Sequence, residues 1–547
     1  MPPLKLVPPL YWLCVGEVFE RVCRVLRNSS QAVKELRKLL QSSLTAAIRE
    51  QFVHIATVQC RRDMYLMLDL LSVLMDGAVR SLHVTGRDDS VCLRPEDCGA
   101  LFSRLEQCGA TGLRELVVKV CLDARRHLLP SCGLAGCTNA CLSRLLQAGL
   151  ARSLRTLVLH AVGDNCLLGL LGQHSAHLQH LDLTSSWLVD DGGIAQLCFR
   201  DPQKHAGHQS MTDEQLLRQY ARVDPSELSR CCATLKEVRI QDTNTSETGV
   251  FLLLLLLPDL RSLGGFIYYR NVGDAIANLA ASRPGLRLAL TDLWDTCVSA
   301  DKARVLGRAV PGLSALYTRG TCLANVGVFA GLTSLTMDFD FSDCSLALEK
   351  YLYAHGARLK KLVLVDQMHS VDISMLAELC PSLEELGAKV EGGWWGESAP
   401  MLGHLKVCQV RVGSSETLRA LLMHAVNLQH LEVMVEEERF GEGVDVFDDT
   451  MMESALGAGG GAAPSSLHTF LMLSECDLSA ATVRLLLEAC PGLRLVGELQ
   501  AWALVGEAEV AQLQREVRER NLDLQLGYRG AVLPPRRLCL PDAALAR

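Results

Sequence analysis

The sequence is poor in aromatic residues and contains no long hydrophobic run. Phenylalanine, tryptophan and tyrosine make up 5% of the 547 residues, whereas hydrophobic residues as a whole make up 49%. The longest apolar run, residues 250–257, is closed by Pro258 and Asp259 and is far shorter than the roughly 20 residues that a bilayer requires. A transmembrane span is therefore not expected, and the composition favours a core of many small, similar aliphatic layers.

The sequence also lacks an excess of positive charge and a recognisable secretion signal. Its net charge is −8 at pH 7, and phosphate binding needs a concentrated basic surface, so nucleic acid is not an expected partner. Glu17, Glu20 and Arg21 interrupt the apolar stretch near the N-terminus, which is unlike a signal peptide. The 22 cysteines are therefore expected to be free thiols in a reducing compartment, the cytoplasm or possibly the nucleus.

A short phrase recurs along the chain: a leucine, two variable residues, a leucine, one variable residue and an aliphatic residue. Clear copies read SLRTLVL, HLQHLDL, TLKEVRI, GLTSLTM, RLKKLVL, NLQHLEV and SLHTFLM, at residues 153–159, 177–183, 234–240, 331–337, 358–364, 427–433 and 466–472. Weaker copies begin at Val79, Leu113, Leu260, Leu286, Leu313, Leu383, Leu402 and Leu493. Many neighbouring copies are 24 to 27 residues apart, which indicates a repeat array.

The phrase and its period resemble those of leucine-rich repeats. Apolar residues two positions apart enter the core from one side of a strand, and the residues between them face solvent. Segments 372–381 and 480–491 show helical spacing that ends at a proline, and Cys380 and Cys490 precede it, as in the cysteine-containing subclass. The sequence therefore predicts an α/β leucine-rich-repeat solenoid with parallel strands on the concave face and helices on the convex face.

The predicted organisation has three parts. Residues 1–78 lack the repeat and are expected to form a helical module, with helices over 30–55 and 62–75. Residues 79–500 form the solenoid, with insertions near 195–230 and 436–464, of which 213–221 is expected to be helical. Residues 501–547 comprise a capping helix over 507–520 and a flexible tail. No asparagine ladder is present, so the turns after the strands must satisfy their backbone groups in another way.

The N-terminal module carries a motif at residues 9–18. Leu10, Cys14 and Val18 are four residues apart and lie on one face of a helix, which Pro9 suits as a starting residue. With Pro9 as the small residue, the motif resembles the BC box of Zyg-like leucine-rich-repeat receptors in elongin BC–cullin ubiquitin ligases. The resemblance implies that Leu10 enters a pocket on elongin C with Cys14 beside it. The alternative is that these side chains only cap the first repeat.

A second element often follows the BC box in such receptors and contacts the cullin. Leu44, Ile48 and Phe52 fill its aliphatic positions, but Thr45 stands where a proline is expected. The resemblance implies a cullin contact through Leu44, Ile48 and Phe52. The departure at Thr45 puts the choice of cullin, and ligase membership itself, in doubt.

Three groups of residues after predicted strands are candidate protein-binding positions. They are Tyr268 and Tyr269 after the Leu260 strand, Asp338 and Asp340 after the Leu332 strand, and Trp394 and Trp395 after the Leu383 strand. Aromatic side chains commonly anchor interfaces, and the aspartates add acidity between them. A partner segment with basic and apolar features would suit such a surface. The alternative is that the loop aromatics fold back onto the solenoid.

No pattern predicts catalysis, a metal site or a cofactor. A glycine-rich phosphate loop, a nucleophile elbow and a paired-carboxylate motif are all absent. Structural thiols and surface imidazoles are the better interpretation of two clusters without zinc-like spacing: Cys132, Cys137 and Cys141, and His174, His177 and His180. Two functions stay open: a ubiquitin-ligase substrate receptor that binds elongins B and C, a cullin and a protein substrate, or a cytosolic interaction scaffold or inhibitor with no ligase link.

Overall fold

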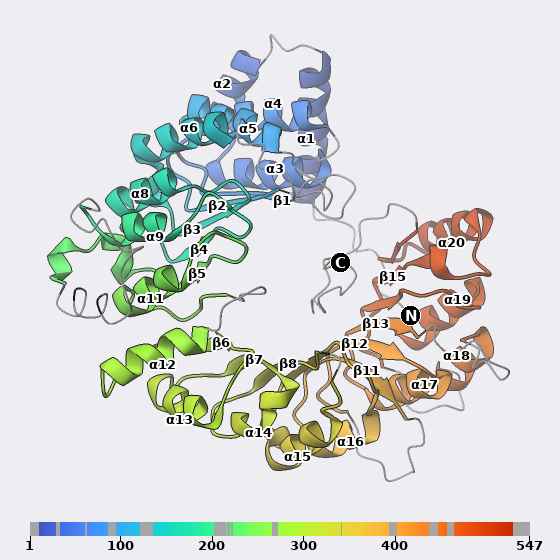
Figure 1. Ribbon diagram of the computed structural model, residues 1–547. Coiled ribbons are helices and arrows are strands. Elements are labelled where there is room, and N and C mark those ends of the chain that lie inside the picture. Colours follow the sequence, from blue (N-terminus) through green and yellow to red (C-terminus); the bar gives the residue numbers. More distant parts are fainter. Residues whose placement is uncertain are drawn as a thin grey trace. The chain divides into compact units, whose positions relative to one another are not determined.

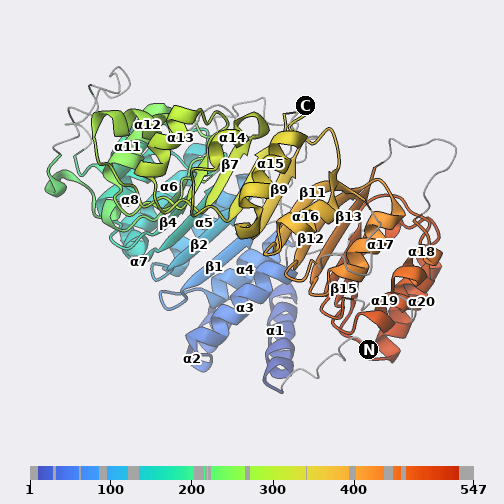
Figure 2. The same cartoon turned by 90° about the horizontal axis from the view of Figure 1, so that it is seen from below.

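The computed structural model describes residues 10–28, 33–60, 63–85, 95–120, 135–201, 215, 219, 223–264, 272–340, 342–392, 402–436, 447–456 and 464–528. The chain divides into two compact units. The N-terminal unit comprises residues 8–295 and 304–313, and the C-terminal unit comprises 1–7, 296–303 and 314–547. In each unit, helices lie along one face of a parallel sheet (Figures 1 and 2). Among the described residues, no helix combines the length and hydropathy needed to cross a membrane.

The N-terminal unit begins with a group of helices: α1 (Leu10–Asn28), α2 (Val33–Ser43), α3 (Ala46–Gln59) and α4 (Met64–Leu74). A 5-stranded parallel sheet follows, paired in chain order: β1 (Ser81–Thr85), β2 (Glu115–Lys119), β3 (Thr156–His160), β4 (His180–Asp182) and β5 (Glu237–Arg239). The helices after β1 are α5 (Pro95–Cys108), α6 (Ala135–Leu145), α7 (Ala151–Ser153), α8 (Asn165–His174), α9 (Asp191–Cys198), α11 (Glu247–Leu256) and α12 (Val272–Ser282). Strand β6 (Asp292–Trp294) and helix α13 (Ala300–Ala309) come next in the chain.

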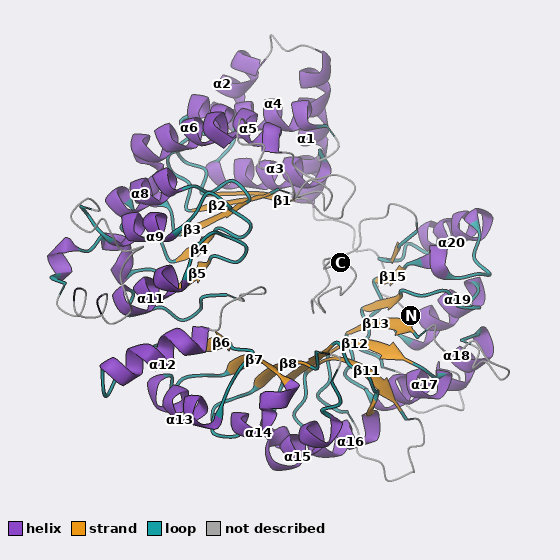
Figure 3. Ribbon diagram, viewed as in Figure 1, coloured by secondary structure: helices purple, strands orange, loops and turns teal. Residues whose placement is uncertain are grey.

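The C-terminal unit repeats this alternation. Its strands are β7 (Ala315–Arg319), β8 (Ser334–Asp338), β9 (Lys361–Val365), β11 (Glu385–Glu391), β12 (Val407–Val412), β13 (His430–Val435), β14 (Thr469–Met472), β15 (Leu495–Gly497) and β16 (Gln525–Leu526), and β10 (Val371–Asp372) pairs beside β11. Its helices are α14 (Leu323–Val326), α15 (Ser345–His355), α16 (Ile373–Leu379), α17 (Ser415–His424), α18 (Asp449–Leu456), α19 (Ala480–Ala489) and α20 (Glu507–Glu519). Most strands are followed by a helix, and each such strand–helix pair forms one repeat of the stack, whereas no described helix lies between β11 and β12 (Figure 3).

The strand register confirms the predicted solenoid fold. The second leucine of each phrase aligns with its counterpart on the next strand, as Leu157 does with Leu181 and Leu362 does with Leu386. These side chains are buried, and Leu431 in β13 is buried equally. At about 25 cal/mol per Å² of apolar surface removed from water, this repeated aliphatic layer is the main stabilising term of the fold.

Two weak repeat copies were predicted in the wrong register. The copy placed at Leu286 begins at Leu290, because β6 starts two residues after Leu290 and Leu286 is only half-buried. The copy placed at Leu402 begins at Leu405, whose position aligns with Leu383 through the β11–β12 register. In both cases a second leucine lies three or four residues away, and the pairing with neighbouring strands selects between the two.

Two other expectations need correction. The helix expected over 30–55 is broken into α2 and α3, because the Thr45 hydroxyl caps α3 by accepting from the Ile48 N–H at 3.4 Å. The sheet also continues past residue 500, since β16 follows α20 and pairs with β15 in parallel. The predicted helix over 213–221 lies largely outside the described residues, and the tail after 528 and Cys132 and Cys137 lie wholly outside them.

The cysteines that precede the helix-ending prolines are core residues. Cys380 and Cys490 are the C-caps of α16 and α19, and both are buried. Burial raises the pKa of each thiol to about 12, so both are neutral and pack as small apolar groups. The expected core role of these two cysteines is confirmed.

In place of an asparagine ladder, acidic side chains between the strands and the helices accept hydrogen bonds from backbone N–H groups at the helix N-termini. The Asp190 carboxylate caps α9 and also accepts from the Asn165 amide of the preceding repeat at 2.8 Å. The buried Asp191 reaches the following repeat, where it accepts from the backbone N–H groups of Ser246 at 2.5 Å and Gly249 at 3.1 Å. Each of these two carboxylates links the N-terminus of α9 to the N-terminus of a neighbouring helix. Hydrogen bonds therefore join adjacent repeats, in addition to the packing of the core.

We expect the Asp191→Ala variant to lose about 2 kcal/mol of unfolding free energy, since the buried N–H of Gly249 and the half-buried N–H of Ser246 lose their acceptor. The measurement is urea unfolding followed by circular dichroism. The exposed Asp259→Ala variant is the control and should change stability by less than about 0.5 kcal/mol. Equal effects of the two substitutions would show that the carboxylate does not link the repeats.

Candidate functional site

Helix α1 has two apolar faces, and only one of them is packed. Val15, Phe19 and Val22 are buried against the other N-terminal helices, together with Cys23 and Leu26. The Phe19 ring meets the Phe52 ring of α3 edge-on, with centroids 5.6 Å apart. The buried face therefore fixes the rotation of α1 about its axis.

The second face of α1 carries the predicted elongin-binding motif and is open to solvent. Leu10 is 77% exposed, Val18 is 39% exposed and Cys14 is also exposed. Tyr11, Leu13 and Val25 extend the exposed apolar surface, and the Tyr11 hydroxyl donates to the Gln51 amide oxygen of α3 at 2.6 Å. The alternative that Leu10, Cys14 and Val18 form the core of a cap is wrong. Pro9 lies outside the described residues.

The predicted cullin-binding positions on α3 are only partly available. Leu44 and Ile48 are half-buried, whereas Phe52 is 1% exposed and packs against Phe19. The prediction that Phe52 contacts a cullin is therefore wrong. Its side chain is buried between α1 and α3 and holds these helices together. Thr45, at the position of the expected proline, is the N-cap of α3.

The outward strand face of the N-terminal unit carries histidine–carboxylate pairs on neighbouring strands. The pairs are His83 with Glu115 at 3.2 Å, His160 with Asp182 at 3.2 Å, and His180 with Glu237 at 3.0 Å. All six side chains are at least partly exposed. This face can therefore offer both hydrogen-bond donors and acceptors to a polar partner surface.

Acidic residues gather where β8 and β9 end in the C-terminal unit, and we call Asp338, Asp340 and Asp366 the acidic edge. The Tyr317 hydroxyl donates to Asp338 at 3.0 Å, and Arg319 pairs with Asp340 at 3.3 Å. Burial and the neighbouring Asp338 carboxylate raise the pKa of Asp366 most, Asp340 adds to this, and the Arg411 guanidinium opposes it. The structure thus brings the predicted residues Asp338 and Asp340 together with Asp366, which the sequence did not single out.

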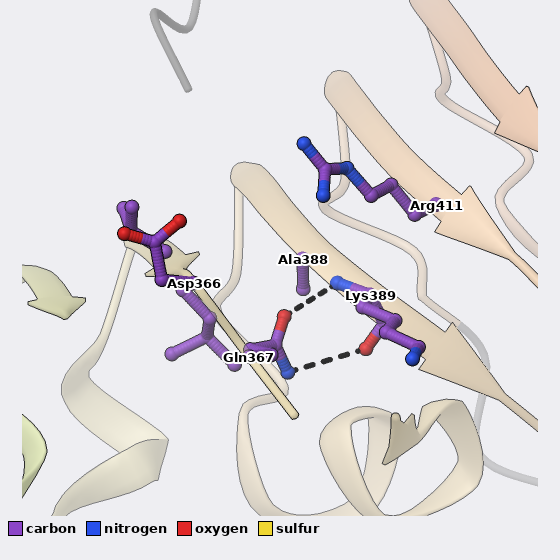
Figure 4. A pocket seen from close by; sticks show the side chains of 7 residues that line it. Asp366, Gln367, Ala388, Lys389 and Arg411 are labelled. Atoms are coloured by element: carbon purple, nitrogen blue, oxygen red, sulfur yellow. Dashed lines mark hydrogen bonds between the residues drawn. The ribbon is translucent and has the colours of Figure 1, made fainter. Parts of the chain in front are cut away.

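A pocket lies beside the acidic edge, at the ends of β9, β11 and β12 (Figure 4). Its floor includes Gln367, whose side chain accepts from the Lys389 N–H at 2.5 Å and donates to the Lys389 carbonyl at 3.3 Å. Asp366 and Arg411 stand on opposite sides of it. With Lys389 also in the lining, one anionic and two cationic residues surround the pocket, which suits a polar ligand better than a purely apolar one.

Part of the outward face of strands β9 to β15 is buried, although Lys389, Arg411 and Met434 on the same face are half-buried or exposed. The buried outward positions, with exposed fractions of 3 to 6%, are Val363, Val365, Val407, Gln409, His430, Glu432, Leu471 and Leu495. On β7 and β8 the equivalent positions are half-buried or exposed. These buried outward positions were not predicted, although valine and leucine at outward positions of a strand are a signal of burial on both faces.

The remaining predicted positions are outside the described part of the chain. Tyr268, Tyr269, Trp394 and Trp395 belong to this group, so their partner-binding role stays a prediction. Within the described residues, no group of three or more histidine, cysteine, aspartate or glutamate side chains is arranged to hold a metal ion.

Asp182 should make the stability of the N-terminal unit depend on pH. Burial would raise its pKa, but hydrogen bonds from His160 and Thr184 lower it to about 2. Because the folded-state pKa lies below the unfolded value, its contribution of about 2 kcal/mol is complete above about pH 5 and is lost as the pH falls to about 2. The stability difference between the unaltered chain and Asp182→Asn, from urea unfolding at each pH, should shrink over this range. A constant difference would contradict this.

No family model and no curated protein matches this chain. Among solved structures, the chain is similar to an internalin (inlF) from Listeria monocytogenes, with 14% identity, a TM-score of 0.35, and coverage of 71% of this chain and 94% of that one. It is also similar to the structure of the Rad7 and Elc1 complex in yeast, with 12% identity, a TM-score of 0.39, and coverage of 80% and 98%. Both TM-scores are low, so the assignment of a leucine-rich-repeat fold rests on this chain's own strand register and buried leucines.

Proposed function

We propose that this chain is a non-catalytic protein-binding subunit that recognises substrates for an elongin BC–cullin–RING ubiquitin ligase in the cytoplasm or nucleus. In this proposal α1 docks on elongin C, and the outward strand faces and their loops capture the protein to be modified. Catalysis would come from the ligase partners, and this chain would supply proximity.

The observation that carries the proposal is the exposure of the motif face of α1. A helix that served only as a cap would place its apolar side chains against the unit, as Val15 and Phe19 do. Leu10 and Val18 instead present apolar surface to solvent, with the Cys14 thiol between them. Exposed apolar patches of this kind mark interaction sites, and helix-in-groove docking uses side chains at such four-residue spacing.

The strand faces support the substrate-binding half of the proposal. The N-terminal unit offers paired histidines and carboxylates, and the C-terminal unit offers the acidic edge beside the pocket. The paired histidines and carboxylates lie on strands whose inward residues are buried, and Asp340 and Asp366 lie just after such strands, so their positions are largely fixed before any partner binds.

One observation favours a second candidate, an interaction scaffold or inhibitor with no ligase link. Phe52 is committed to the contact between α1 and α3, and Thr45 caps α3 where ligase receptors of the resembled type have a proline. The cullin contact on α3 is therefore incomplete in this chain, while the α1 face remains available to another partner.

The Leu10→Ala/Cys14→Ala double variant should bind purified elongin B–C at least tenfold more weakly than the unaltered chain, or about 1.4 kcal/mol. Both side chains are exposed, so their removal should leave the fold unchanged. Affinity is measured by isothermal titration calorimetry, and the thermal unfolding midpoint reports on the fold.

The matched control is Tyr353→Ala, which removes an apolar side chain that is 83% exposed on α15 of the C-terminal unit. It should bind elongin B–C as the unaltered chain does. If the unaltered chain does not bind elongin B–C, the scaffold alternative replaces the ligase proposal. Equal affinity of the double variant and the unaltered chain would remove α1 as the docking element.

A further inference from the structure

Cationic side chains line one edge of the N-terminal unit, where its strands begin. In each repeat, the residue that follows the first aliphatic residue of the phrase lies at this edge, immediately before the strand or bridge. These residues, which we call the basic row, are Arg80, Arg114, Arg155, Gln179, Lys236 and Arg261. The four arginines are exposed, and the glutamine and the lysine are half-buried. The row therefore presents cations and no carboxylate.

Backbone hydrogen bonds fix the spacing of the basic row. The Arg114 N–H donates to the Arg80 carbonyl at 2.7 Å, and the Arg155 N–H donates to the Arg114 carbonyl at 2.8 Å. The same contact continues through the later members of the row at 2.7 or 2.8 Å. Neighbouring members are therefore one strand spacing apart, about 4.8 Å, and the row is about 24 Å long. Like charges at this spacing repel one another, and a bound anion would relieve the repulsion.

Carboxylates of the same unit do not neutralise the basic row. Among the residues that the structure describes, none of its cationic side chains forms an ion pair. Glu115 and Glu237, which follow two members of the row in sequence, instead pair with histidines of the strand face at 3.2 and 3.0 Å. The Arg80 guanidinium donates to the Gly112 carbonyl at 2.9 Å, which holds its side chain but does not cancel its charge.

The C-terminal unit shows that the fold does not require cations at these positions. The same backbone hydrogen bonds define an equivalent row there, and it includes Thr333, Glu384 and Gln429. The Glu384 carboxylate contacts both neighbouring lysines of that row, Lys360 at 3.4 Å and Lys406 at 2.7 Å. Helices α8, α11, α16 and α17 all end five residues before a member of one of these rows. Attraction of cations to helix C-termini therefore does not by itself explain the basic row.

The side chains beside the basic row favour a carboxylate partner over a nucleic acid. A guanidinium binds a carboxylate through two parallel hydrogen bonds. Sites for single-stranded nucleic acid combine cations with aromatic side chains on which the bases stack. The adjacent row of the strand face contains Glu115, Thr156, His180 and Glu237, and none of its members is phenylalanine, tyrosine or tryptophan. A continuous phosphate backbone would also lie against the two glutamates of that row.

An extended peptide fits the length and the two-sided character of this edge. It advances about 3.3 Å per residue, so seven or eight residues span about 24 Å. Its side chains alternate between two faces, so acidic residues at every second position can all turn toward the basic row. The intervening side chains then face the glutamates of the adjacent row and need carry no charge.

We propose that the basic row binds an extended segment of a partner protein in which aspartate or glutamate occupies every second position. Arg114 and Arg155 hold neighbouring carboxylates of this segment, and Lys236 and Arg261 bind it farther along the row. The net charge of the chain is −8, so its surface as a whole repels such a segment and the attraction is local to the row. This inference does not depend on elongin binding, because the basic row lies outside α1.

Fluorescence anisotropy with the full-length chain tests the proposal. The probe is a fluorescein-labelled peptide of about ten residues in which glutamate and serine alternate. It should bind, and raising the salt concentration from about 50 to about 300 mM should weaken its binding at least fivefold, because exposed ion pairs are screened. The same peptide with glutamine in place of glutamate should show no binding.

Charge reversal locates the bound peptide. Arg114→Glu/Arg155→Glu should lower the affinity for the glutamate peptide at least tenfold. Arg515→Glu/Arg518→Glu makes the same change in net charge at exposed positions of α20 and should change the affinity less than twofold.

A milder pair of substitutions keeps the test valid if charge reversal disturbs folding. Lys236→Gln/Arg261→Gln should weaken peptide binding at least threefold, with a thermal unfolding midpoint equal to that of the unaltered chain. Failure of the unaltered chain to bind the glutamate peptide would overturn the proposal, as would equal losses in the two charge-reversal variants. An oligouridylate of about ten nucleotides is the competing probe. If it binds more tightly than the peptide and depends on Arg114 and Arg155, the row is a nucleic-acid site and the proposal is wrong.

Discussion

The structure depends on one constraint: every strand must place its second leucine, or an equivalent apolar residue, beside that of the previous strand. Leu82, Leu116, Leu157 and Leu181 show this in the N-terminal unit, where the register joins them in sequence. A parallel strand pair cannot be closed by a short hairpin, so each step requires a crossover, and the helices that make the crossovers cover the inward face. Inward positions are thereby fixed, and outward positions are left to vary.

The same constraint explains how much of the structure could be predicted. The aliphatic phrase is repeated often enough to give the fold, the direction of the strands and the core positions. It could not decide between Leu286 and Leu290, or between Leu402 and Leu405, because the leucines of each pair are only three or four residues apart and either could begin a degenerate copy. That choice is made by hydrogen bonding to the neighbouring strand, a contact distant in sequence. Strand β16 was missed for a related reason: Leu526 is the counterpart of the phrase's second leucine, but Asp523 stands at the position of the first.

The candidate sites were predictable to different degrees. Spacing placed Leu10, Cys14 and Val18 on one face of α1, but Val15, Phe19 and Val22 form an equally apolar second face. Which face is buried is decided by the shape of α3 and α4, and this is not encoded within α1. Phe52 shows the same limit, since a motif position can be occupied by a residue that the core requires. The buried outward positions of β9 to β15 escaped notice because Gln409, His430 and Glu432 interrupt their apolar row.

The alternation along each strand also has a consequence for how recognition can change with time. Outward residues such as His83 and Glu115 contribute to the surface from separate repeats, while their inward neighbours Leu82 and Leu116 are buried in the core. A substitution at an exposed outward position therefore alters the surface of a single repeat and leaves the buried leucine layer beneath it intact. New binding specificities can therefore accumulate one strand at a time while every intermediate variant still folds. This holds as long as the acidic residues that hydrogen-bond neighbouring helix N-termini are retained.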